Sequence, residues 1–425
     1  MLINKLIISG IKLWVLELST APADKLGVPS VKLIGNIHGN EPVGREVLLH
    51  LIEFFVMNYE SDDKVRWLLD NTRIHILPCL NPDGFQISIQ GRCGVGPGRE
   101  NRRHVDLNRS FPDYFQMNSV PSQDETEAVK SWLHNNTFVL SASLHGGALV
   151  ANYPYENVKE NIQTEINAPS VSPDDDVFQH LAMTYSYKHP SMHRGESCNI
   201  KERGFPNGIT NGAAWYTFTG GMQDYNYVFH GCMEITLEIS CCKYPHASQL
   251  PQLWTDNKAA LLVYIREVHL GVKGLVLDSV TAQPVNNVSL RIAGREIPFR
   301  TSPRGEFWRI LLPGDYQLEV TAPGYVQQKI PFTVPLVKNS QPVWLNVTMS
   351  TFEHQHTTKT VVTDTTEQYS TTTIRESSEH STKTLEVLDS NYEQMAITAG
   401  TDTATCNLIT MLACGLIMYN TYLTT

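Results

Sequence analysis

The chain has 425 residues, 41 % of them hydrophobic and 18 % charged, a composition typical of two or three globular domains. It excludes a wholly disordered chain, a collagen-like chain and a multi-span membrane protein. The 33 basic and 43 acidic residues give a formal net charge of −10, which argues against nucleic acid as a partner because phosphate binding needs a basic surface.

Strands and helices alternate among the predicted elements of the first 270 residues. The stretch 11–18 is apolar on both faces, which is typical of a buried strand. Other strands are predicted at 31–37, 73–77, 138–144 and 233–240, and helices at 45–57, 124–134 and 251–269. Helices interleaved with apolar strands cover a sheet on both faces, so we expect residues 1–270 to form an α/β domain with a mixed, largely parallel sheet.

The pattern changes after residue 270 to short strands separated by turns. Proline and glycine lie close together in these turns, as at 303–305 and 323–324. Strands are predicted at 274–278, 289–292, 307–310, 316–321, 328–334 and 343–349. We therefore expect residues 271–350 to form a small all-β sandwich.

The C-terminal part is predicted to lie outside any packed core. Residues 351–405 are rich in Ser and Thr, which indicates a solvated stalk. Residues 406–425 contain an apolar run shorter than the roughly 20 residues needed to span a bilayer. Such a tail behind small residues favours a GPI-anchor signal, although it could also pack on the protein. No convincing signal peptide begins the chain, so we expect an N-terminally shortened form of a secreted protein.

A set of potential metal ligands follows two of the predicted strands. His38 and Glu41 lie directly after strand 31–37, and His145 ends strand 138–144. The carboxyl ends of parallel strands meet at one edge of the sheet, where sites of such folds form. Two histidines and one glutamate with a free fourth position are typical of a catalytic zinc site, so we predict one Zn²⁺ per chain.

Two further segments carry residues suited to catalysis. The loop 98–112 contains several arginines, which recognise carboxylates through paired hydrogen bonds beside a metal; without the metal motif it would be a solvated basic loop. Strand 233–240 places Glu234 and Glu238 on one face. A carboxylate inside a buried strand is costly unless it is paired or functional. Either glutamate could be the general base, and periodicity does not choose between them.

Five blocks of sequence, in the right order, resemble the zinc metallocarboxypeptidases of the regulatory N/E subfamily. The resemblance covers about residues 10–350 and implies that the sandwich is the transthyretin-like domain of that subfamily. Members of the subfamily normally carry a further helix and strand at the N-terminus. The blocks are HGNEPVGRE (38–46), GRENRRHVDLNRSFPD (98–113), SLHGGALVANYP (143–154), GITNGAAWYTFTGGMQDYN (208–226) and EITLEISCCKYP (234–245).

The resemblance implies which residues perform the chemistry. His38, Glu41 and His145 match the zinc ligands of the family. Glu238 matches the catalytic glutamate, which decides between the two glutamates of its strand. Arg99 matches the arginine that polarises the scissile carbonyl and stabilises the oxyanion.

The resemblance also implies a substrate-binding set. Asn108 and Arg109 match the pair that holds the terminal carboxylate, and Tyr216 matches the tyrosine that closes over the substrate. Gln223 matches a residue of the specificity pocket. Glu156 takes the place of an acidic residue, usually aspartate, that favours C-terminal Lys or Arg.

From these residues we expect a zinc-dependent exopeptidase that removes C-terminal Lys or Arg from peptides and proteins. It is expected to be a monomer on the extracellular face of the cell, held to the membrane by a lipid anchor. Two alternatives remain open. One is a non-catalytic cell-surface binding module, and the other is an aspartoacylase-like deacylase, which shares the His-x-x-Glu…His zinc set.

Overall fold

The computed structural model describes residues 2–6, 10–159, 167–199, 203–336 and 342–352. The predicted Ser/Thr-rich stalk and apolar tail lie outside this range. Within it, no helix combines the length and the apolar character needed to cross a lipid bilayer.

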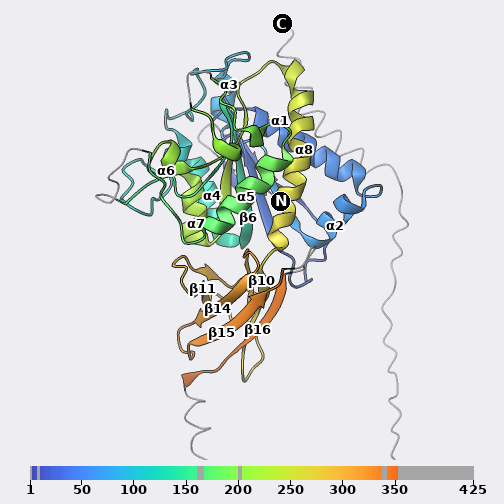
Figure 1. Ribbon diagram of the computed structural model, residues 1–425, viewed down its shortest axis with the longest axis vertical. Helices are drawn as coiled ribbons and strands as arrows, with labels where there is room; N and C mark the ends of the chain where they lie inside the picture. Colours follow the sequence, from blue (N-terminus) through green and yellow to red (C-terminus); the bar gives the residue numbers. More distant parts are fainter. Residues whose placement is uncertain (1, 7–9, 160–166, 200–202, 337–341, 353–425) are drawn as a thin grey trace, which may run out of the picture. The chain divides into compact units, whose positions relative to one another are not determined.

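A seven-stranded sheet forms the centre of the first part of the chain, in the order β3-β5-β4-β6-β9-β7-β8 (Figure 1). The pairs β4–β5, β4–β6, β6–β9 and β7–β8 are parallel, whereas β3–β5 and β7–β9 are antiparallel. The predicted mixed, largely parallel sheet is therefore confirmed. Its strands are β3 (Leu16–Leu18), β4 (Ser30–Gly35), β5 (Arg73–Leu77), β6 (Phe138–His145), β7 (Ala148–Tyr153), β8 (Ile209–Asn211) and β9 (Met233–Ser240).

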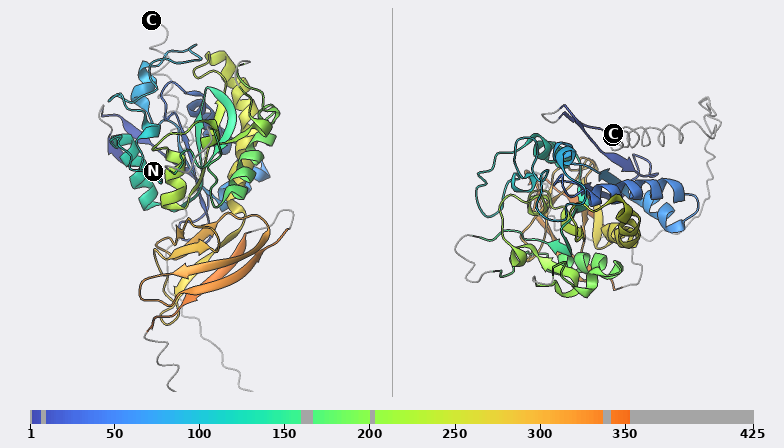
Figure 2. Two further views of the ribbon diagram at one scale, coloured as in Figure 1. Left: turned by 60° about the vertical axis from the view of Figure 1, so that its left-hand side comes forward. Right: turned by 90° about the horizontal axis from the view of Figure 1, so that it is seen from above.

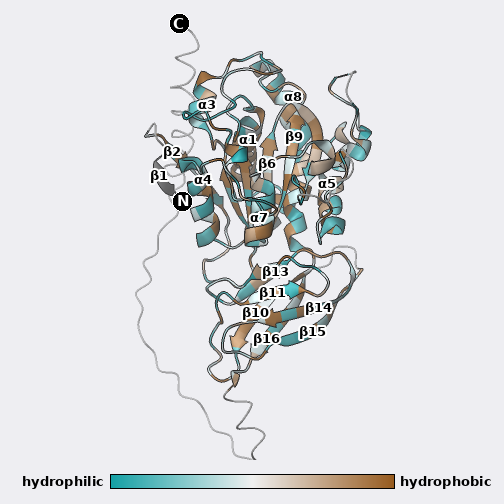
Figure 3. Cartoon of the chain, turned by 90° about the vertical axis from the view of Figure 1, so that its left-hand side faces the viewer, coloured by the Kyte–Doolittle hydropathy of each residue, from teal (hydrophilic) through white to brown (hydrophobic). Residues whose placement is uncertain are grey.

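Helices cover both faces of this sheet, because its central strands are apolar on both sides. In β4, Val31 and Leu33 belong to one hydrophobic cluster and Ile34 to another. The first cluster contains side chains of α1 (Val43–Asn58), α2 (Asp63–Asn71), α5 (Asp175–Lys188) and α8 (Leu250–Arg266). The second contains side chains of α4 (Asp124–Asn135) and α7 (Met222–His230). Figure 3 shows the hydrophobic strands β6 and β9 between these helices.

The stretch 11–18 differs from the single buried strand that was expected. β2 (Lys12–Trp14) pairs with β1 (Leu2–Leu6) in a separate two-stranded sheet, and β3 forms the edge of the central sheet. Leu13 and Val15 are buried, but Trp14 is 60 % exposed. The prediction of burial on both faces was wrong, because β2 is covered on one side only and every residue of β3 is only partly buried.

The sandwich consists of two small sheets around their own hydrophobic cluster (Figure 2). One sheet has the order β13-β10-β16 and the other β12-β11-β14-β15. The strands are β10 (Val272–Asp278), β11 (Ser289–Ile292), β12 (Phe299–Arg300), β13 (Glu306–Arg309), β14 (Gly314–Thr321), β15 (Gln328–Val334) and β16 (Val343–Met349). In β16 exposed residues alternate with more buried ones, as in a strand with one face toward a core.

Several elements of the central domain were not predicted, among them α2, α5, α7, β7 and β8. Two of these begin directly after a pair of glycines. β7 follows Gly146 and Gly147, and α7 follows Gly220 and Gly221. The remaining short elements are α3 (Pro82–Ile87), α6 (Gly212–Trp215) and the 3₁₀ turns η1 (Leu107–Arg109), η2 (Met192–Arg194), η3 (Pro206–Gly208), η4 (Ala247–Gln249) and η5 (Glu267–His269).

Candidate metal centre and substrate pocket

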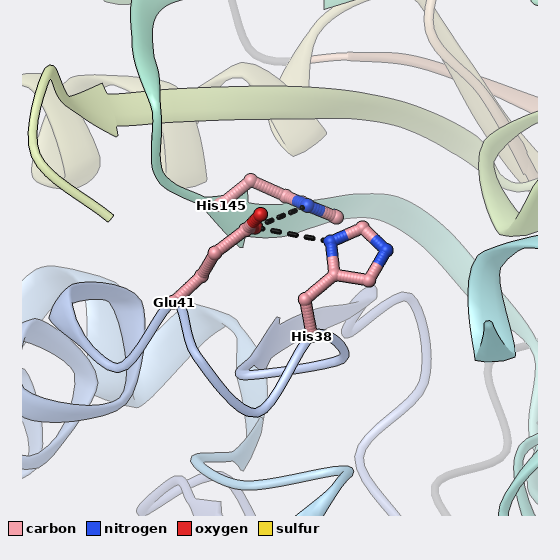
Figure 4. A group of neighbouring side chains, drawn as sticks. All are labelled: His38, Glu41 and His145. Atoms are coloured by element: carbon pink, nitrogen blue, oxygen red, sulfur yellow. Dashed lines mark hydrogen bonds and ion pairs between the residues drawn. The ribbon is translucent and has the colours of Figure 1, made fainter. Parts of the chain in front are cut away.

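His38, Glu41 and His145 converge at the carboxyl ends of β4 and β6. His38 and Glu41 lie in the loop between β4 and α1, and His145 is the last residue of β6 (Figure 4). Glu41 Oε2 lies 3.1 Å from Nδ1 of His38 and 3.0 Å from Nδ1 of His145. The three donor atoms lie within 4.8 Å of one another. Two imidazole nitrogens and one carboxylate oxygen at this spacing fit a single zinc ion.

Tight backbone packing holds the loop that carries His38 and Glu41. A Cβ atom at Gly39 would overlap the backbone of Gly84, and one at Gly44 would overlap the Leu144 side chain. Only glycine allows this approach, so the loop lies directly against α3 and the first turn of α1 lies against the end of β6.

The second ring nitrogen of each histidine is also engaged. Nε2 of His38 lies 3.0 Å from Asp106 Oδ1, and Nε2 of His145 lies 3.0 Å from Ser143 Oγ. Such outer partners fix the orientation of an imidazole and its tautomer, which leaves the Nδ1 atoms to bind a metal. The Nδ1 atoms of His38 and His145 are therefore already oriented as ligands for a metal ion.

The carboxyl group of Glu41 is kept ionised although it is buried. Burial alone would raise its pKa, but His38 and His145 outweigh this effect and hold the pKa well below its ordinary value. Two cationic side chains also reach the carboxylate: Lys243 Nζ bonds to its Oε1 atom, and Arg99 Nη1 lies 3.5 Å from the same atom. The Glu41 carboxylate is therefore ionised and can act as a ligand to a metal cation.

Glu238 lies beside the metal centre in the sheet. It is paired with His145 across the parallel strands β6 and β9, and its Oε2 atom is buried without a hydrogen-bond partner in the described part of the chain. Burial and the charge of Glu41 raise the pKa of this carboxyl group, while His145, Lys243 and Arg99 oppose the rise. The other strand glutamate, Glu234, is instead paired with Lys32 at 2.9 Å in the core.

One pocket of about 110 Å³ opens over these groups. Of the ten residues that the sequence assigned to the site, all but Arg109 and Gln223 line it: His38, Glu41, Arg99, Asn108, His145, Glu156, Tyr216 and Glu238. The guanidinium of Arg109 lies 3.6 Å above the ring of Phe218, which itself lines the pocket. Asn108 Oδ1 accepts a hydrogen bond of 2.9 Å from the Met222 amide at the start of α7.

Two polar residues predicted to receive the substrate side chain are buried, and only the first of them lines the pocket. Glu156 is 1 % exposed and lines the pocket, and its Oε2 atom has no hydrogen-bond partner among the described residues. Gln223 is also 1 % exposed, and both ends of its amide are unpartnered in the same sense. Burial is the largest of the effects that raise the pKa of Glu156 well above its ordinary value. Buried polar atoms of this kind are costly unless a ligand satisfies them.

Two disulfides hold the segment that follows β9. Cys93 is bonded to Cys242, and Cys198 is bonded to Cys241. The first ties the glycine-rich loop before Arg99 to the residue that precedes Lys243. The paired cysteines are 149 and 43 residues apart, and such pairing cannot be deduced from their spacing along the chain.

Sequence reasoning did not single out Asp106, Lys243 or Ser143. Asp106 lies inside the arginine-rich block, two residues before Asn108, where a carboxylate beside arginines was an available signal. Lys243 directly follows Cys241 and Cys242 in the sequence, and it binds Glu41, which is 202 residues away along the chain. Nothing in its local sequence indicates this position.

The comparison with protein families gives two matches. A family described as zinc carboxypeptidase matches residues 8–260, and one described as carboxypeptidase regulatory-like domain matches residues 271–350.

Curated relatives match most of the described chain. Carboxypeptidase M of Mus musculus is 50 % identical over 338 residues, which cover 79 % of this chain and 75 % of that protein. Carboxypeptidase D of Mus musculus is 45 % identical over 317 residues, 74 % of this chain but 23 % of that longer protein. The carboxypeptidase N catalytic chain of Homo sapiens is 41 % identical over 353 residues, 77 % of this chain and 76 % of that one.

Proposed function

Since this chain belongs to the zinc carboxypeptidase family, within which the relatives M, D and N place it in the regulatory N/E subfamily, we propose that it removes C-terminal Lys or Arg from peptides and proteins. The chain is a metallocarboxypeptidase. The observation that carries the substrate assignment is the buried carboxyl group of Glu156 in the pocket beside His38, Glu41 and His145, whose Oε2 atom has no hydrogen-bond partner among the described residues. A lysine or arginine side chain would supply the missing cation.

His38, Glu41 and His145 hold one zinc ion in this proposal. When bound, zinc polarises a carbonyl group and makes water a better nucleophile at neutral pH. Asp106 and Ser143 keep both imidazoles in the orientation that presents Nδ1.

Glu238 is the proposed general base. Its buried carboxylate takes a proton from the attacking water and later passes that proton to the leaving amine, so the group is regenerated at the end of the cycle. The guanidinium of Arg99 donates hydrogen bonds to the carbonyl oxygen as negative charge develops there. Asp106 holds this guanidinium through Nη2 at 2.9 Å.

The terminal carboxylate of the substrate is held by Asn108, Arg109 and Tyr216. Phe218 supports Arg109 from below, and the amide of Met222 fixes Asn108. The basic side chain then enters the buried region with Glu156 and Gln223. An exopeptidase results because the pocket accepts a chain end with a free carboxylate.

We also propose that the protein lies outside the cell, as a monomer held to the membrane by its C-terminal tail. Two disulfides form and persist in oxidising compartments. The sequon residues Asn135, Asn287 and Asn346 are all exposed, as glycan acceptors must be.

The first test measures zinc-dependent release of arginine from a dansyl-Ala-Arg dipeptide by the wild type and by Glu238→Gln. We expect chelator-sensitive activity in the wild type and a fall of at least about 10²-fold in kcat for the variant, which keeps the shape of the side chain but loses the base. Equal zinc binding and equal thermal stability of both proteins control for folding. If the zinc-bound wild type releases no arginine, the binding-module alternative is favoured.

Glu156→Gln tests the substrate class. We expect kcat/KM for the Arg-terminated dipeptide to fall by about 30-fold or more, because a cation would enter without its partner. Activity on a Leu-terminated dipeptide should change little. Hydrolysis of N-acyl amino acids without any cleavage of either dipeptide would instead support the deacylase.

A further inference from the structure

Asp224, in the first turn of α7, lies directly behind Glu156. Its Oδ2 atom accepts a hydrogen bond of 2.9 Å from the backbone amide of Glu156. Its Oδ1 atom is buried without a partner among the described residues, and the whole residue is 4 % exposed. The same turn leaves no room for a side chain before it, since a Cβ at Gly221 would overlap Glu156 Oε2. The Glu156 side chain is thus pressed against the start of α7.

A third carboxylate completes the support of this segment. The side-chain amide of Asn157 donates to both carboxylate oxygens of Asp113 at 3.1 Å, and the Gly220 amide donates to Asp113 Oδ2 at 3.1 Å. Asp224 of α7 therefore binds Glu156, and Asp113, in the loop after η1, binds Asn157. Both holding groups are acidic.

No ion pair of the described residues balances this acidic group, although the charge of Arg109 opposes the rise in the pKa of Glu156. Within residues 10–159, 167–199 and 203–336, no ion pair includes Glu156, Asp224 or Asp113. The charge of Asp113 and, above all, burial raise the pKa of Asp224 to about 8. The raised pKa values of Asp224 and Glu156 mean that these groups retain protons near neutral pH in the free protein, and an entering cation favours their ionised form.

Hydrogen bonding alone does not require a carboxylate at position 224. An asparagine would accept the Glu156 amide equally well and would avoid a second buried acid. We propose that Asp224 is a positioning residue that fixes Glu156 in the pocket and adds a second negative charge for the basic side chain of the substrate. This inference rests on the proposed removal of C-terminal Lys or Arg.

The first turn of α7 also contacts both residues proposed to bind the C-terminal residue of the substrate, one at its carboxylate and one at its side chain. The Met222 amide fixes Asn108 at the carboxylate end, and Asp224 fixes Glu156 at the side-chain end. One helical turn therefore sets the distance between the two recognition groups. Substitution of Asp224 should therefore affect substrate binding more than the chemical step.

The test compares Asp224→Ala and Asp224→Asn in the full zinc-loaded chain, with dansyl-Ala-Arg and dansyl-Ala-Leu as substrates. For Asp224→Ala we expect KM for the Arg substrate to rise about tenfold or more, with kcat within about twofold of the wild type and the Leu substrate little changed. Asp224→Asn keeps the hydrogen-bond acceptor, so we expect a smaller rise in KM. Calorimetric binding of free arginine should weaken in the same order.

Asn226→Ala is the matched control. Asn226 is buried on the same helix, but its side chain bonds only to the Met222 carbonyl oxygen, at 2.7 Å, among the described residues. This variant should lose stability without a change in the preference for Arg over Leu. An unchanged KM in Asp224→Ala, or an equal loss of kcat/KM on both substrates, would overturn the inference. If the wild type itself shows no preference for Arg, the proposed function fails and this inference fails with it.

Discussion

Asp106 serves two residues of the site at once. Its Oδ1 atom lies 3.0 Å from His38 Nε2, and its Oδ2 atom accepts hydrogen bonds from Arg99 at 2.9 and 3.0 Å. Burial would raise the pKa of this carboxyl group, but His38 and the two arginines Arg99 and Arg109 hold it well below its ordinary value. At the scale of single residues, this carboxylate connects the candidate metal ligand His38 to Arg99, the proposed partner of the carbonyl oxygen.

Asp106→Asn is expected to weaken zinc binding by about 10- to 100-fold. The substitution keeps the size of the side chain but removes the charge that supports the His38 imidazole, and second ligand-shell partners of this kind typically contribute that much. Competition with a chromophoric chelator measures the zinc dissociation constant without reference to activity.

The control for this change is Asp124→Asn, which removes an acidic residue paired with Arg103 on the surface at 3.5 Å. Its zinc affinity should equal that of the wild type. If Asp106→Asn also binds zinc as the wild type does, Asp106 does not support the metal centre.

Three neighbouring strands are joined by a polar row inside the apolar sheet. Lys32 in β4, Ser141 in β6 and Glu234 in β9 lie side by side in register. Lys32 Nζ lies 2.9 Å from both Ser141 Oγ and Glu234 Oε2, and both ionic side chains are fully buried. At the scale of elements, this row specifies which strands are neighbours, since a slip of one residue would leave two charges unpaired.

Lys32→Met is expected to lower the free energy of unfolding by about 3–5 kcal/mol, because it leaves the Glu234 carboxylate buried and alone. The double variant Lys32→Met/Glu234→Leu should be less destabilised than the sum of the two single variants. Urea unfolding of all four proteins measures this coupling.

Lys130→Met supplies the comparison at the surface. Lys130 pairs with Glu127 one helical turn earlier in α4, where such pairs contribute about 0.3–0.5 kcal/mol. A double-mutant cycle for Lys32 and Glu234 that shows no coupling would mean that the buried row does not stabilise the sheet.

The central domain and the sandwich are joined by a buried ionic contact. Asp174, which precedes α5, bonds to Arg309 of β13, to Arg295 at 2.8 Å and to the Tyr227 hydroxyl at 2.6 Å. Arg309, the hydrogen bond from Tyr227 and the charge of Arg295 lower the pKa of Asp174 against the effect of burial. At the scale of the whole molecule, α7 thus supports pocket residues through its first turn and takes part in this contact through Tyr227.

Stability is expected to fall in mildly acidic solution. Burial lowers the pKa of His75 and His189 to about 4 and that of His269 to about 3, whereas each would titrate near its ordinary value of 6.5 in the unfolded chain. The unfolded state therefore binds more protons below about pH 6.5, and stability is lost progressively as the pH falls toward 4. Unfolding midpoints at pH 7.5, 6.0 and 5.0 measure the slope.

His269→Gln should flatten this slope, because His269 is buried against Thr72 Oγ1 at 2.8 Å and its neutral form is required. His104→Gln should not, since His104 is exposed. A midpoint that stays constant from pH 7.5 to 5.0 in the wild type would show that these histidines do not control stability.

The sequence by itself was sufficient for the fold class, for the positions of the main strands and for a candidate set of metal ligands, which the structure brings together. These depend on local patterns: alternation within β9, apolar runs in β4 and β6, and ligands placed directly after strands. The resemblance of five blocks to a known family then assigned Glu238 rather than Glu234, and the structure places Glu234 in the Lys32 pair.

Only the tertiary structure decided the contacts between distant parts of the chain. These are the pairing of Cys93 with Cys242, the position of Lys243 beside Glu41, and the support of Glu156 by Asp224. Spacing along the chain contains no information on such contacts, because a loop of many residues can close at almost the same entropic cost in several ways. The edge strands near the N-terminus were misjudged for a related reason, since exposure depends on which neighbours cover a strand and not on its own apolar residues.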